Sequence, residues 1–203
     1  MNISFPGPSI AIIKDFYDER ELGLIWKELD YLNSKGKFLP PEKTGAARDA
    51  KGNIIKSSKG LFLDEYYTNR NFSNVLTANR KIWTATEKLA KENINFRYLK
   101  SCNSDATLVN YYEDGDYYQR HTDTAVYTVL SYFYKEPKKF SGGNLKLLDY
   151  DIEVEVKSNM VIYMPSILWH EVTSIVMEQE FLNKGYGRYC MAQFLFIENT
   201  VDD

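Results

Sequence analysis

Apolar residues in the first half of the chain recur at two spacings, which predict one strand and two helices. Residues 9–17 form a nearly continuous apolar run, as in a buried strand. Asp18 and Glu21 then have the spacing of a capping box, so a helix is expected over 19–33. A second helix is expected over 71–93. Both helices are predicted from apolar residues at helical spacing, which are Leu22, Ile25, Leu29 and Leu32 in the first, and Val75, Ala78, Ile82, Trp83, Leu89 and Ala90 in the second.

The second half of the chain has the pattern of short strands separated by polar turns. Its apolar segments are rich in β-branched and aromatic residues, and residues 152–157 alternate between apolar and charged side chains. Strands are expected at 106–112, 124–134, 152–157, 160–164 and 188–197, with turns at 113–116, 141–144 and 184–187. Many short strands of this kind favour a barrel or a sandwich. The fold class is therefore α+β, mostly β with flanking helices.

The segment 34–60 differs from both halves because it is polar and strongly basic. It holds seven basic residues and only Glu42 and Asp49 as acidic ones. Residues 49–53 have the Gly and Asn of a hairpin turn. Two interpretations have equal weight: a solvated surface loop, or a lid that covers a substrate. In either case a single domain is expected over 1–203, with a flank at 1–100 and a β core at 101–198.

The overall composition excludes several classes of protein. The 203 residues are 44% hydrophobic and carry a net charge of -3, which argues against a nucleic-acid partner, because such proteins normally present a basic surface. No run approaches the roughly 18 apolar residues of a membrane helix, and the N-terminus lacks the pattern of a secretory signal. Two cysteines are too few for a disulfide framework. We expect a cytoplasmic monomer or homodimer.

The chain contains only two histidines, and both fall where a metal site could form. His121 and Asp123 are two residues apart in a stretch expected to be extended, so their side chains point to the same side. His170 follows a later strand and could complete a facial triad, which leaves three coordination positions open on iron. A lone His-x-Asp is a weak signal, and an isolated histidine is more often a surface or core residue than a ligand. The two histidines together favour the metal site.

Arg188 begins the last expected strand, on the same face as Cys190, Ala192 and Phe194. That face is apolar, so the arginine is expected to point into the interior. A buried guanidinium is costly without an anionic partner, and no acidic residue shares this face. A small dicarboxylate could supply the anion through a bidentate contact. The alternative is an arginine at the strand mouth that reaches solvent.

These motifs together resemble the prolyl 4-hydroxylase-like branch of the iron(II)/2-oxoglutarate-dependent dioxygenases. The resemblance covers about residues 106–198 and rests on four blocks, which are Asn110–Asp123, Ser141–Leu145, Val161–Pro165 with His170–Val172, and Gly187–Tyr189. It implies a double-stranded β-helix (jelly-roll) core with the N-terminal helices packed on one sheet. It also implies Fe(II), 2-oxoglutarate and O2, with His121, Asp123 and His170 as metal ligands, and ascorbate as a candidate reductant.

The resemblance further assigns residues to 2-oxoglutarate. Arg188 and Tyr132 match the pair that holds its distal carboxylate, and Tyr112 matches a tyrosine beside the co-substrate. Core packing is the alternative for both tyrosines. Tyr132 shares strand parity with other inward residues, whereas a one-residue slip would exchange Tyr112 with Tyr111.

The implied reaction is hydroxylation of a C–H bond with release of succinate and CO2. A prolyl residue in a peptide or protein is the favoured substrate. A small molecule or free amino acid is the second candidate, and a non-catalytic metal-binding jelly-roll protein is the third.

Three positions distinguish this chain from other relatives. Residues 177–184 look like an insertion before Arg188. Phe194 stands where relatives that repair nucleic acids carry a second arginine, which counts against a nucleic-acid substrate. Asp123 is retained where halogenating relatives have a small residue, which favours hydroxylation.

Overall fold

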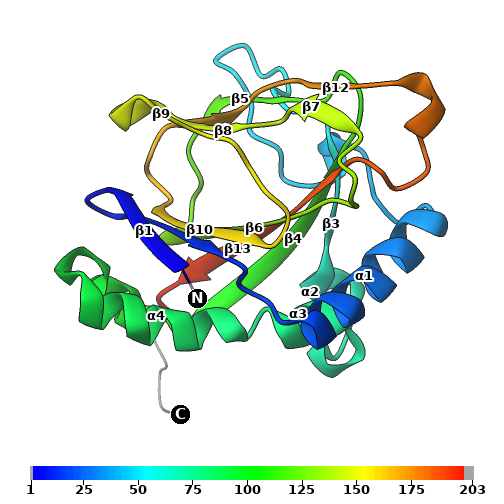
Figure 1. The fold of residues 1–203 in the computed structure, drawn as a ribbon. Coiled ribbons are helices and arrows are strands. Elements are labelled where there is room, and N and C mark those ends of the chain that lie inside the picture. Colours follow the sequence, from blue (N-terminus) through cyan, green and yellow to red (C-terminus); the bar gives the residue numbers. More distant parts are fainter. Residues whose placement is uncertain (1, 199–203) are drawn as a thin grey trace.

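The computed structural model describes residues 2–198, and its main element is a seven-stranded antiparallel sheet (Figure 1). We refer to it as the major sheet. Its strands, in spatial order, are β1 (Asn2–Gly7), β2 (Ile10–Lys14), β10 (Met160–Pro165), β6 (Tyr127–Phe133), β13 (Arg188–Phe196), β4 (Ser104–Tyr112) and β3 (Lys59–Phe62). Because neighbours in this order come from distant parts of the sequence, the sheet links the N-terminal strands to the C-terminal half of the chain.

Shorter strands form a second layer above the major sheet (Figure 1). The minor sheet contains β5 (Tyr118–His121), β11 (His170–Val172), β8 (Leu145–Leu147) and β9 (Ile152–Val154), and a separate pair joins β12 (Ile175–Met177) to β7 (Phe140–Gly142). All of the strand pairs in both layers are antiparallel. The two facing sheets confirm the expected mostly-β jelly-roll core.

Helices cover the opposite face of the major sheet, as expected (Figure 1). The α-helices are α1 (Glu19–Ser34), α2 (Leu63–Tyr66), α3 (Asn74–Ala78) and α4 (Lys81–Glu92), and the 3-10 helices are η1 (Pro41–Lys43), η2 (Arg70–Phe72), η3 (Ile94–Ser101), η4 (Leu148–Tyr150) and η5 (Gln179–Phe181). The predicted capping box is present, because Asp18 accepts from the Glu21 amide and Glu21 accepts from the Asp18 amide, each at 2.8 Å. Among residues 2–198, no helix is both long and apolar enough to cross a membrane.

Two predicted elements differ most from the structure, while the strands expected over 152–157 and 124–134 are shorter than predicted, at Ile152–Val154 and Tyr127–Phe133. The helix expected over 71–93 is divided into η2, α3 and α4. At the break between α3 and α4, the side-chain Nδ2 of Asn79 donates to Thr107 Oγ1 on β4 at 2.8 Å, which holds the break against the sheet. The strand expected over 9–17 ends at Lys14, because Asp15 adopts a positive φ of 53° and turns the chain toward α1.

Alternate residues of the central strands serve two separate apolar cores. On β13, Tyr189, Met191 and Leu195 pack against the helices, whereas Cys190 and Ala192 face the minor sheet. Strand β6 is buried at every position because both of its faces are covered. The parity of each strand therefore decides whether a side chain meets the helices or the space between the sheets.

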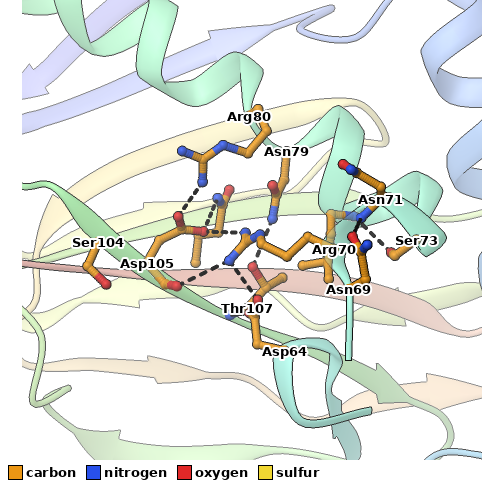
Figure 2. A network of polar contacts seen from close by, with 12 residues as sticks. Asp64, Asn69, Arg70, Asn71, Ser73, Asn79, Arg80, Ser104, Asp105 and Thr107 are labelled. Carbon is orange, nitrogen blue, oxygen red and sulfur yellow. Dashed lines mark hydrogen bonds and ion pairs between the residues drawn. The ribbon is translucent and has the colours of Figure 1, made fainter. Parts of the chain in front are cut away.

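Charged residues on the helix side of the sheet form a paired network (Figure 2). Arg70 donates to Asp64 at 2.6 Å and to Asp105 at 2.8 Å, and Arg80 also pairs with Asp105. Asp64 in addition accepts from the amide of Thr107 at 2.7 Å. The network connects α2, η2 and the start of α4 to β4, and each of its cations has a carboxylate partner.

Candidate metal centre and adjoining cavity

The two histidines lie opposite each other on neighbouring strands of the minor sheet. His121 ends β5 and His170 begins β11, and the antiparallel register pairs one with the other. The sequence pattern had placed each histidine just after the end of an expected strand, not within a strand. Strands of four and three residues are too short to show alternation, so β5 and β11 were missed.

Asp123 follows β5 by two residues and completes a cluster of three possible metal ligands. One donor atom from each of His121, Asp123 and His170 lies within 4.8 Å of the others. The Nε2 atom of His121 is 3.8 Å from Asp123 Oδ1, and the Nε2 atom of His170 is 3.6 Å from Asp123 Oδ2. The structure therefore brings together the three residues that the sequence analysis had selected.

Backbone contacts fix the tautomers of both imidazole rings. The Nδ1 atom of His121 lies 2.7 Å from the carbonyl oxygen of Gln119, and Nδ1 of His170 lies 2.8 Å from that of Leu168. A carbonyl can only accept, so each Nδ1 carries the proton and each Nε2 keeps its lone pair. Orienting contacts of this kind are typical of metal-binding histidines.

Burial also keeps His121 in the form that binds a metal. Its side chain is almost fully enclosed, and desolvation lowers the pKa of His121 to about 3, with smaller contributions from the neighbouring His170 and Lys56 side chains. The imidazole is therefore neutral near pH 7. Tyr118 stacks on this ring, with 3.6 Å between the ring centroids, and limits its rotation.

Asp123 is oriented by its own set of contacts. The hydroxyl of Thr128 donates to Asp123 Oδ2 at 2.6 Å and lies 2.8 Å from the hydroxyl of Ser166. The backbone amide of Asp123 donates to the Ser166 carbonyl at 2.9 Å. Two neutral imidazole nitrogens and one fixed carboxylate form the donor set of a facial triad, so these residues fit Fe(II).

Arg188 is fully buried at the start of β13 and has few partners for its charge. Its Nη1 donates to the carbonyl oxygen of Gly143 at 2.6 Å, which the positive φ of 69° at Gly143 makes possible. Its Nε and Nη2 atoms have no hydrogen-bond partner among the described residues, and no ion pair there includes Arg188. The prediction of an inward-pointing arginine is confirmed, and its unpartnered N–H groups fit an added carboxylate.

The rings of Tyr112 and Tyr132 lie between Arg188 and the cavity described below. The guanidinium carbon is 4.1 Å from the ring centre of Tyr112 and 5.3 Å from that of Tyr132. The hydroxyl of Tyr132 is buried without a partner among the described residues, and burial raises its pKa well above the usual value. The hydroxyl is therefore protonated and can donate to an anion.

The strand register also separates Tyr112 from Tyr111. Tyr112 lines the cavity between the sheets, whereas Tyr111 packs in the helix-side core and donates to Glu113 at 2.7 Å. The sequence pattern could not decide whether Tyr111 or Tyr112 faces the cavity. The pairing of β4 with β13 decides it, because Tyr112 lies opposite Arg188.

A cavity of about 300 Å³ lies between the two sheets. The three candidate ligands line it together with Tyr112, Tyr118 and Tyr132. Further from Arg188, its wall is formed mainly by apolar side chains from the major sheet, which are Phe62, Ala106, Leu108, Ala192, Phe194 and Phe196. The cavity thus has a polar end at the metal ligands and an apolar end along β4 and β13.

Part of the basic segment 34–60 forms a wall of this cavity. Thr44, Gly45, Ala47 and Lys56 all line it. The segment also contains the expected hairpin turn, in which Asp49 accepts from the amides of Lys51 and Asn53 at 2.8 and 2.9 Å. The turn at 49–53 is therefore a solvent-exposed loop, whereas residues on either side of it line the cavity.

Sequence analysis missed Lys56 as a site residue. It had been counted with six other basic residues as part of a surface charge, yet its side chain is only 4% exposed and points into the cavity. The apolar pair Ile54 and Ile55 before it is the only local signal that this part of the segment is buried.

The C-terminal half of the chain matches a known protein family. Residues 106–196 match the family model of the 2OG-Fe(II) oxygenase superfamily. An uncharacterised PKHD-type hydroxylase of Synechocystis sp. is 33% identical over 84 residues. That match covers 32% of this chain and 28% of the relative, so it spans well under half of either protein.

Solved structures share the fold at low sequence identity. A prolyl-4-hydroxylase from Pseudomonas putida aligns with a TM-score of 0.62 at 15% identity, covering 94% of this chain and 93% of that one. A prolyl hydroxylase from Trichoplax adhaerens, solved with a peptide fragment of a hypoxia-inducible-factor degradation domain, aligns with a TM-score of 0.59 at 15% identity. That alignment covers 94% of this chain and 84% of that one. At these identities the likeness concerns the fold alone.

Proposed function

We propose that this chain belongs to the 2OG-Fe(II) oxygenase superfamily, whose family model matches residues 106–196, and that it is an iron(II)- and 2-oxoglutarate-dependent dioxygenase. One observation carries the proposal: a buried His-Asp-His cluster lines a cavity, and behind Tyr112 and Tyr132 in the cavity wall lies a buried arginine whose Nε and Nη2 have no partner among the described residues. The cluster accounts for a metal, and the arginine accounts for a dicarboxylate co-substrate.

In this proposal His121, Asp123 and His170 hold the iron. Both imidazoles offer Nε2 because their Nδ1 protons are engaged by backbone carbonyls. Thr128 holds the Asp123 carboxylate at the angle where it can complete the set. Bound Fe(II) with 2-oxoglutarate and O2 supplies the oxidising chemistry, in which decarboxylation to succinate and CO2 accompanies insertion of one oxygen atom into a substrate C–H bond.

Arg188 and Tyr132 are assigned to the distal carboxylate of 2-oxoglutarate. The guanidinium can donate from Nε and Nη2, and the Tyr132 hydroxyl can donate beside them, because none of the three has another partner among the described residues. Tyr112 covers the guanidinium and lines the cavity, so we assign it to the wall beside the co-substrate. The enclosed walls exclude water and strengthen each of these contacts.

We assign the substrate carbon to the apolar end of the cavity, and a prolyl residue of a peptide or protein is the first candidate. A pyrrolidine ring suits the apolar wall formed by Leu108, Phe194 and neighbouring side chains. The similarity in fold to two prolyl hydroxylases agrees with this choice. Hydroxylation of a free amino acid or another small molecule is the second candidate, and the buried cation at Lys56 favours it.

The segment 34–60 is proposed as the cover of the substrate, within a single domain that spans the chain. Its residues Thr44, Gly45 and Ala47 already contribute to the cavity wall. Hydrogen exchange should then slow across 44–57 when Fe(II) and 2-oxoglutarate are added, compared with metal-free protein. Unchanged exchange in that segment would contradict the cover and leave the iron site untouched.

Succinate formation tests the enzymatic proposal most directly. Protein with Fe(II), 2-oxoglutarate, ascorbate and air is expected to form succinate slowly without substrate, and faster with peptides that contain proline than with matched alanine peptides. An anaerobic sample is the control. Iron-loaded protein that forms no succinate under any of these conditions would support a non-catalytic metal-binding protein instead.

A further inference from the structure

Lys56 differs from the other basic residues of its segment because it is enclosed. Its backbone pairs with Tyr118 as an antiparallel bridge, so residues 55–57 run beside the edge strand β5 of the minor sheet. Its side chain crosses to the major sheet, where Nζ donates to Asn110 Oδ1 at 2.6 Å. It also donates to Thr44 Oγ1 at 3.2 Å. The ammonium therefore lies inside the cavity wall between the two sheets.

Neither partner of Lys56 carries a charge. No ion pair among residues 2–198 includes Lys56, in contrast to Arg70 and Arg80 on the helix side. An ammonium has three donors, and these two contacts use only two of them. Burying a cation without a counter-charge is costly, so a neutral side chain would serve better if the role were only to join the sheets.

The net charge of the site with Fe(II) and 2-oxoglutarate bound also indicates that Lys56 lacks an anionic partner among the described residues. In the proposed holoenzyme the two carboxylates of 2-oxoglutarate balance Fe(II), and Asp123 balances one of the two buried cations, Arg188 and Lys56. Counted over these groups, one positive charge then remains; the carboxylate of Asp116 acts on Lys56 but does not line the cavity. Burial lowers the pKa of Lys56 to about 8, and the surrounding Cys190, Asp116 and Asp123 oppose this shift, so the cationic form predominates near pH 7.

We propose that Lys56 binds a carboxylate of the substrate, and that the substrate is an amino acid with a free carboxylate, either as a free molecule or as the last residue of a chain. The inference deepens the proposed function and rests on it. It follows from the enclosed position of Lys56, because a residue in the middle of a peptide has no charge on its backbone to offer. A cavity of about 300 Å³, shared with the co-substrate, has room for one residue.

The test compares acids with their amides in binding experiments that involve no turnover. Protein loaded with Fe(II) and 2-oxoglutarate under anaerobic conditions is titrated calorimetrically with the twenty free amino acids and with their amides. A second set uses Gly-Gly-Xaa tripeptides with free or amidated ends. We expect at least one acid to bind tenfold or more tightly than its amide, as for a charge-assisted hydrogen bond. The first set detects free amino acids, and the second detects chain ends.

Three variants show whether Lys56 causes that preference. Lys56→Met should reduce the acid-to-amide ratio to about one, and Lys56→Arg should retain part of it. Lys51→Met, in the exposed turn of the same segment, should leave the ratio unchanged. The acid and amide affinities are compared within each variant, so a smaller folded fraction lowers both and does not change their ratio. Thermal unfolding provides a separate check on folding.

Several results would overturn the inference. They are the absence of any acid preference in the wild-type protein, an unchanged preference in Lys56→Met, or a loss of 2-oxoglutarate affinity in Lys56→Met as large as the loss for the acid. The last result would assign Lys56 to the co-substrate. Failure of the proposed function is seen separately, because it requires that no succinate forms in air even without a substrate.

Discussion

The two faces of the major sheet treat charged side chains in opposite ways. On the helix side, Arg70 and Arg80 pair with Asp64 and Asp105, and the network joins helices to strand β4 (Figure 2). On the cavity side, Arg188 is more deeply buried than either, yet it has no carboxylate partner among the described residues. The same type of side chain thus stabilises the fold on one face and remains available to a ligand on the other.

This difference separates charges that are paired within the protein from a buried charge that has no anionic partner among the described residues. An ion pair that is complete within the protein adds little net stability, but removing its cation leaves the buried carboxylate of Asp105 with fewer partners. A buried cation that lacks an anion costs stability in the free protein, and the cost is recovered only when a ligand supplies the anion. The expected effects of substitutions on the two faces therefore differ in kind, and they are given below from the largest to the smallest.

Loss of a metal ligand should have the largest effect, and only on the cavity side. His121→Ala is expected to reduce succinate formation to background and to weaken Fe(II) binding strongly, because two ligands alone hold iron poorly. Iron titration of the purified variant measures this directly. Unchanged iron affinity would remove His121 from the site.

Matched arginine substitutions on the two faces should give opposite results. Arg188→Met is expected to weaken 2-oxoglutarate binding by about 2 kcal/mol or more, which is roughly thirtyfold, without a loss of thermal stability. Arg70→Met should leave 2-oxoglutarate binding unchanged but destabilise the fold by about 2 kcal/mol, since it leaves Asp64 and Asp105 with fewer partners.

Calorimetry and thermal unfolding measure the two outcomes in the same samples. The expected decrease in melting temperature for Arg70→Met is roughly 4–8 °C for a domain of this size. If Arg188→Met destabilised the fold as much as Arg70→Met does, the distinction between the two faces would not hold.

Removing the hydroxyl that orients Asp123 should have an intermediate effect. Thr128→Val keeps the shape of the side chain but removes the donor to Asp123 Oδ2. Contacts of this kind contribute roughly 10- to 100-fold to metal affinity. Iron affinity should fall by a factor in that range. The variant Thr77→Val on α3, on the helix side, is the control and should not change it.

Tyrosine-to-phenylalanine substitutions on the two faces should have the smallest effects on binding and stability. Tyr132→Phe removes a hydroxyl without a partner and should weaken 2-oxoglutarate binding roughly tenfold, as expected for a hydrogen bond to a charged group. Tyr112→Phe should have a smaller effect on the same binding. Tyr111→Phe faces the helices, so it should cost about 1 kcal/mol of stability through its contact with Glu113 and leave co-substrate binding unchanged.

Elements with strong local signals could be predicted from the sequence. Helix α1 was expected over 19–33 and is observed over Glu19–Ser34, because its capping box and apolar stripe are both local features. The helix expected over 71–93 was wrong as a continuous element, because the chain divides into η2, α3 and α4, and the Asn79 side chain at the second break contacts the distant strand β4. Short strands such as β5 and β11 form only through their partners, and they carry no periodic signal of their own.

The sequence by itself determined the chemistry available to this protein: two histidines, an aspartate at the right spacing and an arginine on an apolar strand face. Only the tertiary structure decided how these groups meet. Register between β4 and β13 selected Tyr112 over Tyr111, and the path of residues 55–57 beside β5 carried Lys56 from an apparent surface charge into the cavity. The physical reason is that side-chain identity is local, whereas burial and the presence or absence of a partner depend on segments far apart in the chain.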